Sequence, residues 1–463
     1  MSTVDGVLTS TALPRAPAVR ARRPARALTL HRFLALLALH GALALVFRSV
    51  PQLAALHALA AIGAGLWLAC SRQPDRVFYA ACYIAGSEVL WRMTQAPIFW
   101  ETGKYAVTLI LGVYIARVGL RTRFSLWPLA YLGFLVPGAL VTLQELGFSG
   151  ASRDALSFNL SGPISLGVCL TAFASADLRK IRLSRLMMNL LWPIGGIATL
   201  AAYSTLTASA IEFSTESNFT TSGGYGPNQV SAILSIGALA GVLLALLDTR
   251  RRTALLCYGL AAGLLFQAVL TFSRGGVFAV LVCLAVLMAH YFWRPDIGLS
   301  YLIAVVLITV IAGGWLMPRL NSWTGGALAE RYASLDTTHR SEIASEDVEL
   351  FFDHPVAGVG VGLAKSKRKS ARYLGIAPHT EFSRVLAEHG SFGVLALLAL
   401  AAMTAARYVT APSFLTKGWV CSLTVWCLAT MSVSAMRLSI LGVLFGIAYL
   451  PWQQLAPSKE ARS

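Results

Sequence analysis

The chain has 463 residues, of which 56% are hydrophobic and 13% are charged, and its formal net charge is +17. A soluble protein carries about 25% charged residues, so a soluble multi-domain architecture is excluded. Apolar runs of roughly 17–25 residues recur along the chain, each long enough to cross the hydrocarbon core of a bilayer. Since these Leu-, Ala- and Val-rich runs lack the alternation of barrel strands, the sequence predicts an all-α polytopic membrane protein.

The first 29 residues are rich in Ala, Pro and Arg and include arginines at positions 20, 22, 23 and 26. No small-residue cleavage site follows the first apolar run, which ends near Phe47 before ArgSerValPro. We therefore interpret residues 1–29 as a disordered, basic cytoplasmic tail that orients the first helix, rather than as a cleaved signal peptide.

The apolar runs predict about 12–14 transmembrane helices, the lower number applying if some pairs are merged or re-entrant. The runs lie near 30–48, 53–70, 77–94, 103–117, 125–145, 159–177, 186–206, 228–247, 254–272, 276–293, 298–317, 391–408, 416–432 and 435–453. They divide the chain into an N-terminal transmembrane bundle (30–317), one large hydrophilic loop with short helices (318–390), C-terminal transmembrane helices (391–453) and a short tail (454–463).

Cations are concentrated in alternate turns between the predicted spans. If the N-terminal tail is inside, these turns are inside as well, which is the positive-inside pattern. Both termini are then cytoplasmic, and residues 318–390 lie outside, in the periplasm of a bacterial cell. Because the cations are spread over short turns, we expect contacts with membrane lipids and no nucleic-acid partner. The cations are Arg72, Arg76, Arg117, Arg121, Arg123, Arg179, Lys180, Arg182, Arg185, Arg250, Arg251 and Arg252.

The seven cysteines all fall in or beside apolar runs and none lies in the large loop. A disulfide scaffold or a cysteine-based zinc site in that loop is therefore excluded. The chain also lacks a HisGluXaaXaaHis pattern and a carboxylate cluster, so we expect no metal ion and no cofactor.

The loop 318–390 is electrically balanced, because residues 318–388 hold nine Lys or Arg and nine Asp or Glu. Residues 343–352 alternate apolar and acidic side chains, which predicts a helix lying at the membrane surface. Three glycines at 358, 360 and 362 permit tight turns, but no P-loop lysine pattern follows them. The cationic stretch 365–372 is either a solvated face near lipid headgroups or a substrate-binding segment.

His379 is the main catalytic candidate. It follows Pro378 and opens a helical run in which Glu381 and Arg384 are interleaved with apolar residues. The positive end of a helix dipole favours neutral imidazole, which can act as a base. Among the other loop histidines we expect a structural role for His389, one turn from the bilayer, while His339 and His354 are intermediate cases.

Two features outside the loop are expected on the same side of the membrane. Arg274 lies in the turn 271–276, where an arginine at the membrane edge marks an anionic partner, unless it only snorkels to the interface. Asn228 and Gln229 occupy the first turn of a helix that follows a Gly-rich segment. A helix N-terminus suits anion or sugar binding, and the alternative is a simple turn with an N-cap.

Several of these motifs occur together in a recognisable order over residues 220–400. They are SerArgGlyGly (273–276), Arg340 with Glu342, HisProValAlaGlyValGlyValGly (354–362) and ProHisThrGluPheSerArgValLeuAlaGluHisGlySerPheGly (378–393). This order resembles the O-antigen ligase and polymerase superfamily. GlyTyrGlyProAsnGln (224–229) and SerPheAsnLeuSerGlyPro (157–163) are similar to a subgroup met in exopolysaccharide and O-antigen loci.

The resemblance implies a glycosyltransferase that takes a glycan from undecaprenyl diphosphate at the outer face of the inner membrane. The acceptor is a hydroxyl of another lipid-linked glycan in polymerases, of lipid A core in ligases and of a protein in oligosaccharyltransferases. By motif position, the essential histidine of the family maps to His379 and its arginines map to Arg274 and Arg340. Many relatives have Asn where this chain has Thr380.

The residues suit such chemistry without a metal, because a neutral histidine can take the acceptor's proton and guanidinium groups can stabilise a departing diphosphate. We expect a surface polysaccharide polymerase, for exopolysaccharide or O-antigen, with an O-antigen ligase as the first alternative. The expected catalytic residue is His379, and the expected substrate-binding residues are Arg274, Arg340, Asn228, Gln229, Glu381 and Arg384.

Two other classes stay open. A transporter or flippase is favoured by Glu88 with Arg92, and by Arg437, which are ionisable residues within predicted spans. The single large loop and the lack of a clear internal repeat argue against transport. A non-catalytic membrane scaffold leaves the polar motifs unexplained.

Overall fold

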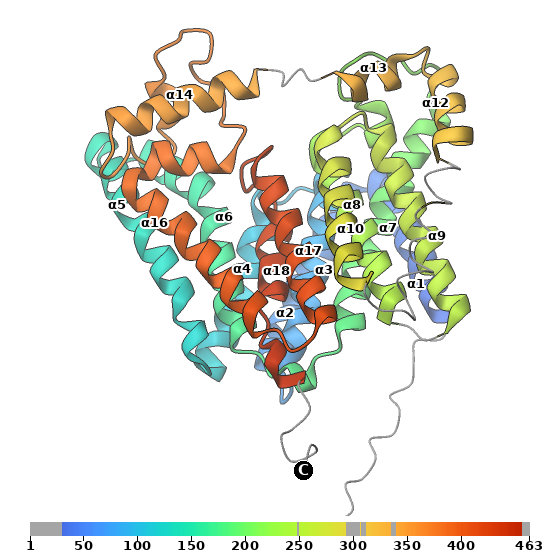
Figure 1. Ribbon diagram of the computed structural model, residues 1–463, viewed down its shortest axis with the longest axis horizontal. Helices are drawn as coiled ribbons and strands as arrows, with labels where there is room; N and C mark the ends of the chain where they lie inside the picture. The colour runs from blue at the N-terminus through green and yellow to red at the C-terminus, as the bar shows by residue number, and fades with distance from the viewer. Residues whose placement is uncertain (1–29, 248–249, 293–305, 307–311, 335–338, 456–463) are drawn as a thin grey trace, which may run out of the picture.

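The computed structural model describes residues 30–247, 250–292, 306, 312–334 and 339–455 (Figure 1). The predicted tail at 1–29, most of the predicted tail at 454–463 and most of the predicted span at 298–317 lie outside the described residues. Within them the regular elements are helices and no strand is present, which confirms the all-α prediction.

Ten of the described helices are long and apolar enough to cross a membrane. With α3 and α4, which have 17 residues each and carry buried charged side chains, they make twelve long helices, the lower end of the predicted range. The twelve are α1 (Leu30–Ser49), α2 (Pro51–Cys70), α3 (Val77–Met93), α4 (Thr102–Val118), α5 (Trp127–Leu146), α6 (Gly150–Ala174), α7 (Leu183–Thr207), α8 (Pro227–Leu247), α9 (Arg251–Leu270), α10 (Arg274–Tyr291), α16 (Glu381–Thr410) and α17 (Phe414–Met431).

Four short helices gather at one end of the bundle, here called the loop end (Figure 1). They are α12 (Met317–Trp323), α13 (Ala327–Ala333), α14 (Arg340–Asp353) and α15 (Ala364–Lys367). Helix α14 contains the helix predicted at 343–352, and it lies across the ends of the long helices rather than along them (Figure 1). Its buried side is formed by Ile343, Asp347 and Leu350.

Helix α8 is the centre of one half of the bundle. Its sequence is apolar all round, and such a helix is stable when it is enclosed by others. It packs against α7, α9 and α10, and α10 in turn packs against α17. In the other half α16 packs along α5, and the short helix α18 (Ile440–Ala448), in which every residue is buried, packs on α6.

The turns that carry the cations meet at the end opposite the loop end. The Arg121 guanidinium lies 3.7 Å from Asp75, and Asp75 also accepts a hydrogen bond of 3.1 Å from the backbone N–H of Asp177. The side chain of Gln454 accepts a hydrogen bond of 2.8 Å from the N–H of Leu178. The α2–α3, α4–α5 and α6–α7 turns therefore share one end, as the predicted threading requires.

The backbone of the Gly-rich motif 354–362 packs against α16 at the point where that helix is interrupted. At Gly390 the backbone leaves the helical region (φ 59°), and the N–H of Ser391 bonds to Pro355 instead of continuing the helix. The carbonyls freed by this break accept hydrogen bonds from the N–H groups of Val359 (2.9 Å) and Gly360 (3.3 Å). The motif thus satisfies buried backbone groups, which a membrane environment demands.

Candidate functional site

The loop end contains a non-helical segment, 432–439, between α17 and α18. The sequence predicted one continuous span at 435–453, and the structure instead has this segment followed by a nine-residue helix, α18. Irregular backbone at membrane depth is tolerated where protein groups or a polar cavity satisfy it. The mean hydropathy of residues 435–453 does not reveal the non-helical segment, because the apolar residues after position 440 dominate that average.

Charged side chains from several helices hold the backbone of this 432–439 segment. Glu88 of α3 accepts two hydrogen bonds of 2.7 Å from Ser439, one from its N–H and one from its hydroxyl. Arg92, one turn later, donates to the carbonyl of Arg437 at 3.3 Å. Glu88 and Arg92 also pair with each other at 2.6 Å. Pairing offsets part of the cost of burying the two charges. The pair of Glu88 and Arg92 thus stabilises the backbone of the 432–439 segment.

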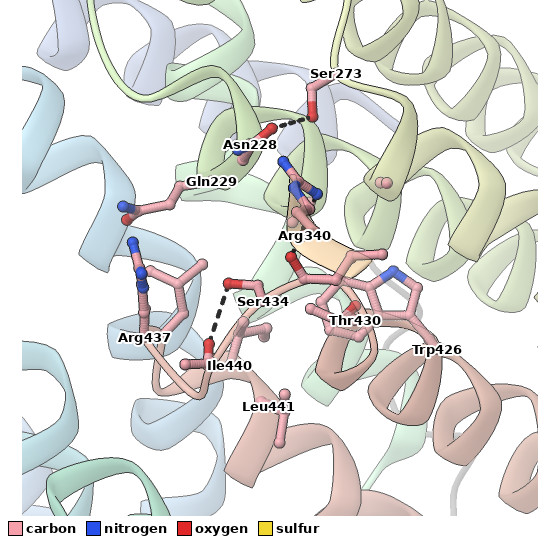
Figure 2. A pocket seen from close by; sticks show the side chains of 16 residues that line it. Asn228, Gln229, Ser273, Arg340, Trp426, Thr430, Ser434, Arg437, Ile440 and Leu441 are labelled. Atoms are coloured by element: carbon pink, nitrogen blue, oxygen red, sulfur yellow. Dashed lines mark hydrogen bonds between the residues drawn. The ribbon is translucent and has the colours of Figure 1, made fainter. Parts of the chain in front are cut away.

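Two adjoining cavities flank the segment. The inner cavity, of about 40 Å³, is lined by Gln229, Arg437 and Trp426 among others (Figure 2). The arginine cavity, which is wider at about 410 Å³, is lined by Arg274, Arg331 and Arg340 with Tyr332 and Thr380. Asn228, Gly275, Arg340 and Val433 line both cavities and so form the wall between them.

The arginine cavity brings together three guanidinium groups from three helices. Arg274 begins α10 and donates to the carbonyls of Ser334 and Arg331, which ties it to α13. Arg331 donates to the carbonyl of Phe272 at 3.1 Å, and Arg340 to that of Val433 at 3.4 Å. Burial, followed by the charges of neighbouring arginines, lowers the pKa of Arg340. This mutual repulsion makes the cavity a favourable place for an anion.

Figure 2 shows Arg340 reaching into the centre of the site, between Asn228 on one side and Ser434 on the other. Asn228 accepts a hydrogen bond of 2.8 Å from the hydroxyl of Ser273. Gln229 accepts from Arg92 at 2.9 Å and from the Tyr225 hydroxyl at 3.1 Å. The structure therefore places Asn228, Gln229, Arg274 and Arg340 around the two adjoining cavities, and their predicted contact with substrate stays a prediction.

His379 lies at the rim of this site, immediately before Thr380. It is half-buried. Burial and then the charges of Arg340, Arg437 and Arg368 lower the pKa of His379 to about 4. The preceding carbonyl, of Pro378, accepts a hydrogen bond of 3.5 Å from Arg437. The imidazole is therefore neutral at pH 7, as expected for a histidine next to a helix N-terminus and arginines.

Thr380 is the N-cap of α16. Its hydroxyl oxygen accepts a hydrogen bond of 3.0 Å from the N–H of Ser383. Asn and Thr are both good N-cap residues, so the departure from the Asn common in the superfamily preserves this task. This N-cap fixes the residue at which α16 begins and therefore the position of His379, which precedes it.

Glu381 and Arg384 are placed behind the cavities rather than in their walls. Both are buried, and they pair with each other through two hydrogen bonds. Arg384 also bonds to Glu388 at 2.8 Å, and Glu381 accepts from the N–H of Met436 at 3.0 Å. Their predicted contact with substrate stays a prediction, and the geometry favours a positioning role that joins α16 to the 432–439 segment.

The cationic stretch 365–372 divides into one buried and several exposed side chains. The Arg368 guanidinium is fully buried and bonds to Asp347 at 2.9 Å, while Asp347 also accepts from the Ser383 hydroxyl at 3.0 Å. Arg368 further donates to the carbonyls of Tyr373 and Ile376. Arg368 therefore holds the segment that precedes His379 against α14. Neither the lipid-headgroup interpretation nor the substrate-binding interpretation of residues 365–372 had predicted this role.

The other loop histidines stand apart from the cavities. His389 is buried against Gly138 of α5, where no side chain could fit, in line with its expected structural role. His354 is exposed at the end of α14, and His339 is exposed and contacts Arg372 at 3.0 Å.

Sequence reasoning missed Arg331 and did not place Arg437 in the site. Arg331 falls in a polar stretch without a motif, so nothing in its neighbourhood in sequence marked it. Arg437 and the pair of Glu88 and Arg92 were visible as charges in apolar runs, and their meaning depended on the bend at 432–439. Within the described ranges, no group of three or more His, Cys, Asp or Glu is close enough to hold a metal ion.

Comparison with known proteins supports the resemblance. The family model described as O-Antigen ligase matches residues 259–398, a range that contains Arg274, Arg340 and His379. No curated protein matches the chain. The match indicates an activity of the ligase or polymerase type, carried out by a multi-pass membrane protein on lipid-linked glycans and their acceptors. Over residues 259–398 the chain therefore matches the O-antigen ligase family, in agreement with the resemblance seen in its motifs.

Proposed function

We propose that this protein is a metal-independent polymerase of a surface polysaccharide. It transfers a glycan from undecaprenyl diphosphate to a sugar hydroxyl at the loop end of the bundle, which faces the periplasm from the inner membrane. The observation that carries the proposal is the arginine cavity, where Arg274, Arg331 and Arg340 meet beside Thr380, the residue that follows His379. A diphosphate matches three clustered guanidinium groups in charge and in hydrogen-bonding geometry.

In the proposed reaction the acceptor hydroxyl oxygen bonds to the anomeric carbon of the donor sugar, and the bond from that carbon to the phosphate oxygen breaks. His379 accepts the hydroxyl proton, and undecaprenyl diphosphate leaves with the bonding electron pair. The guanidinium groups of Arg274 and Arg340 stabilise the charge that develops on the leaving group. Attack opposite the leaving group inverts the anomeric centre.

The charge on the donor also tunes the base. Arginine charges contribute to the low pKa of His379, about 4. A bound diphosphate offsets the charges of Arg340 and Arg437, so we expect the pKa of His379 to rise towards neutrality in the complex. A base is most effective when its pKa is near the working pH, so the donor itself would prepare His379 for proton transfer.

The geometry also bears on transport, the second alternative. Glu88, Arg92 and Arg437 were the features that favoured a transporter. Arg92 donates to the backbone of Arg437, and Glu88 accepts from Ser439, so their place in the apolar spans has a structural explanation. This supports the enzyme over the flippase.

The test uses purified protein in liposomes with the lipid-linked glycan of its own cells, in buffer containing EDTA. We expect the lipid-linked glycan to grow by whole repeats. Transfer to added lipid A core without such growth would identify a ligase instead. Movement of the glycan across the bilayer with no new glycosidic bond would overturn the enzyme proposal. Activity that is lost in EDTA and restored by Mg²⁺ would contradict metal independence.

A further inference from the structure

A third cavity, here called the aromatic cavity, opens at the loop end between α3 and α4. It encloses about 190 Å³ and is lined by Arg92, Gln95, Phe99, Trp100 and Thr102 among others. Phe99 is 62% exposed and Trp100 is 51% exposed, although large aromatic side chains are usually well buried. The cavity therefore has an apolar aromatic rim and polar groups within reach.

Trp100 is held as a fixed platform. The Arg92 guanidinium carbon lies 4.7 Å from the centre of the Trp100 ring, and Arg92 also donates to the Trp100 carbonyl at 3.0 Å. One face of the Trp100 ring contacts the Arg92 guanidinium, and half of the side chain is exposed. The exposed part can therefore stack against a flat, weakly polar ligand.

Arg92 is held in place at this cavity by several partners. Its side chain is 4% exposed, and its terminal nitrogens bond to Glu88, Gln229, Trp100 and Arg437. These contacts keep the guanidinium group, and with it the Trp100 ring, in one position.

We propose that the aromatic cavity is a subsite for a neutral sugar residue of the glycan substrates. A pyranose ring offers a C–H face for Trp100 and Phe99 and hydroxyl groups for the exposed Gln95 amide. The carboxylate of Glu88 is already paired with Arg92, so the cavity selects for polarity rather than charge. This inference rests on the proposed function and deepens it.

The aromatic cavity is linked to the inner cavity through contacts of Arg92 and Trp100. Gln229 lines the inner cavity and accepts a hydrogen bond of 2.9 Å from Arg92, which lines the aromatic cavity. Trp100 also contacts Tyr225, with ring centres 6.2 Å apart. A glycan whose reacting end lies near Arg340 and His379 can therefore reach Trp100 through its next sugars.

The test measures binding of free sugar, which requires no transfer. The probe is the set of oligosaccharides released by mild acid from the surface polysaccharide of the cells that make this protein. Binding to the protein in nanodiscs is followed by saturation-transfer NMR. We expect Trp100→Ala to weaken binding roughly five- to tenfold, and Trp100→Phe to weaken it less, because stacking persists. His379→Ala should bind the oligosaccharides normally, even if it transfers none.

Trp323→Ala is the matched control, because Trp323 is 48% exposed at the loop end and lines none of the three cavities. Equal binding by Trp100→Ala and wild type would overturn the proposal and assign Trp100 to the aromatic belt at the membrane surface. No binding to the wild type at millimolar probe would overturn it as well. If saturating lipid-linked donor displaces the probe, the subsite holds donor sugars; if the probe stays bound, it holds the acceptor.

Discussion

At the scale of single residues, His379 and His354 offer a direct comparison between two loop histidines. His379 adjoins the arginine cavity, whereas His354 is exposed at the end of α14. General-base assistance contributes roughly 10²–10⁴-fold in rate, so His379→Ala should lower glycan transfer by about that factor. His354→Ala should stay near wild type. The measurement is glycan chain length in membranes at matched protein level; normal chains from His379→Ala would make that histidine structural.

The ionisation of His379 gives a second residue-scale prediction. Only the neutral imidazole can accept a proton, and the pKa of His379 is about 4. The value of kcat/KM reports the free enzyme, so it should stay flat as pH falls from 7 to 5 and decline only towards about 4. The value of kcat reports the substrate complex and should decline at a higher pH, because the diphosphate raises the pKa. An acidic limb near pH 6.5 in kcat/KM would contradict the arginine environment.

The arginines of the cavity should tolerate little change. Losing one partner of a buried charge pair costs about 2–5 kcal/mol, so Arg340→Ala should weaken donor binding by about 30-fold or more. Arg274→Lys should also be impaired if planar, two-point contacts matter. Arg319→Ala is the control, because Arg319 lies on α12 outside the three cavities and stacks on Trp315 at 4.2 Å. Donor binding in detergent gives the comparison, and full activity of Arg274→Ala would refute its role.

Motif residues were the part of the site that the sequence could predict. His379, Arg274 and Arg340 sit in short motifs, so their types and order were informative. The cap formed by Thr380 and the pair of Glu381 with Arg384 depend on which groups face them in space. Spacing along the chain carries no information about such partners, so the contacts of Glu381 with Met436 and of Arg384 with Glu388 could not be predicted from it.

At the scale of elements, the Gly-rich motif makes a prediction about stability. Gly358 has φ 72°, and an added Cβ would lie 2.4 Å from the carbonyl carbon of Glu388. Gly358→Ala therefore combines backbone strain with overlap against α16, costs of about 1–2 and 1–3 kcal/mol respectively. Gly375→Ala isolates the strain, because Gly375 has φ 80° and open space around it. The midpoint temperature of thermal unfolding in detergent should be lowered more by Gly358→Ala than by Gly375→Ala. Equal effects would exclude the interpretation that residues 354–362 pack closely against the break in α16.

The predictable elements were the long ones. Runs of apolar residues located α1 to α5, α7 to α10 and α17 within a few residues, because the length of a span is fixed by the bilayer. Helices α6 and α16 begin well before the runs predicted at 159–177 and 391–408, because their first turns are polar. The 432–439 segment was not predictable in this way. Its stability comes from Glu88, Arg92 and Glu381, which are far away in sequence and supply hydrogen bonds that a helix would have made internally.

At the scale of the whole molecule, the distribution of charge predicts the orientation. The turns that hold Asp75, Arg121 and Asp177 contact one another, and Arg274, Arg340 and Thr380 meet at the other end. Cations next to membrane spans stay on the cytoplasmic side, so the loop end should face the periplasm. The threading that the sequence predicted and the grouping of turns in the structure agree, and which side is which stays a prediction.

Reporter fusions at Lys369 and Ser463 test this orientation. Lys369 follows α15 at the loop end and its side chain is 62% exposed, so a reporter joined there is accessible from that side of the membrane. A periplasmic phosphatase should be active at Lys369 and inactive at Ser463, and a cytoplasmic fluorescent reporter should show the reverse. If Lys369 faced the cytoplasm, the arginine cavity and His379 would lie on the wrong side for a donor exported to the periplasm. That result would overturn the orientation and the proposed reaction together, whereas a periplasmic Ser463 alone would leave the C-terminal span count as the point to revise.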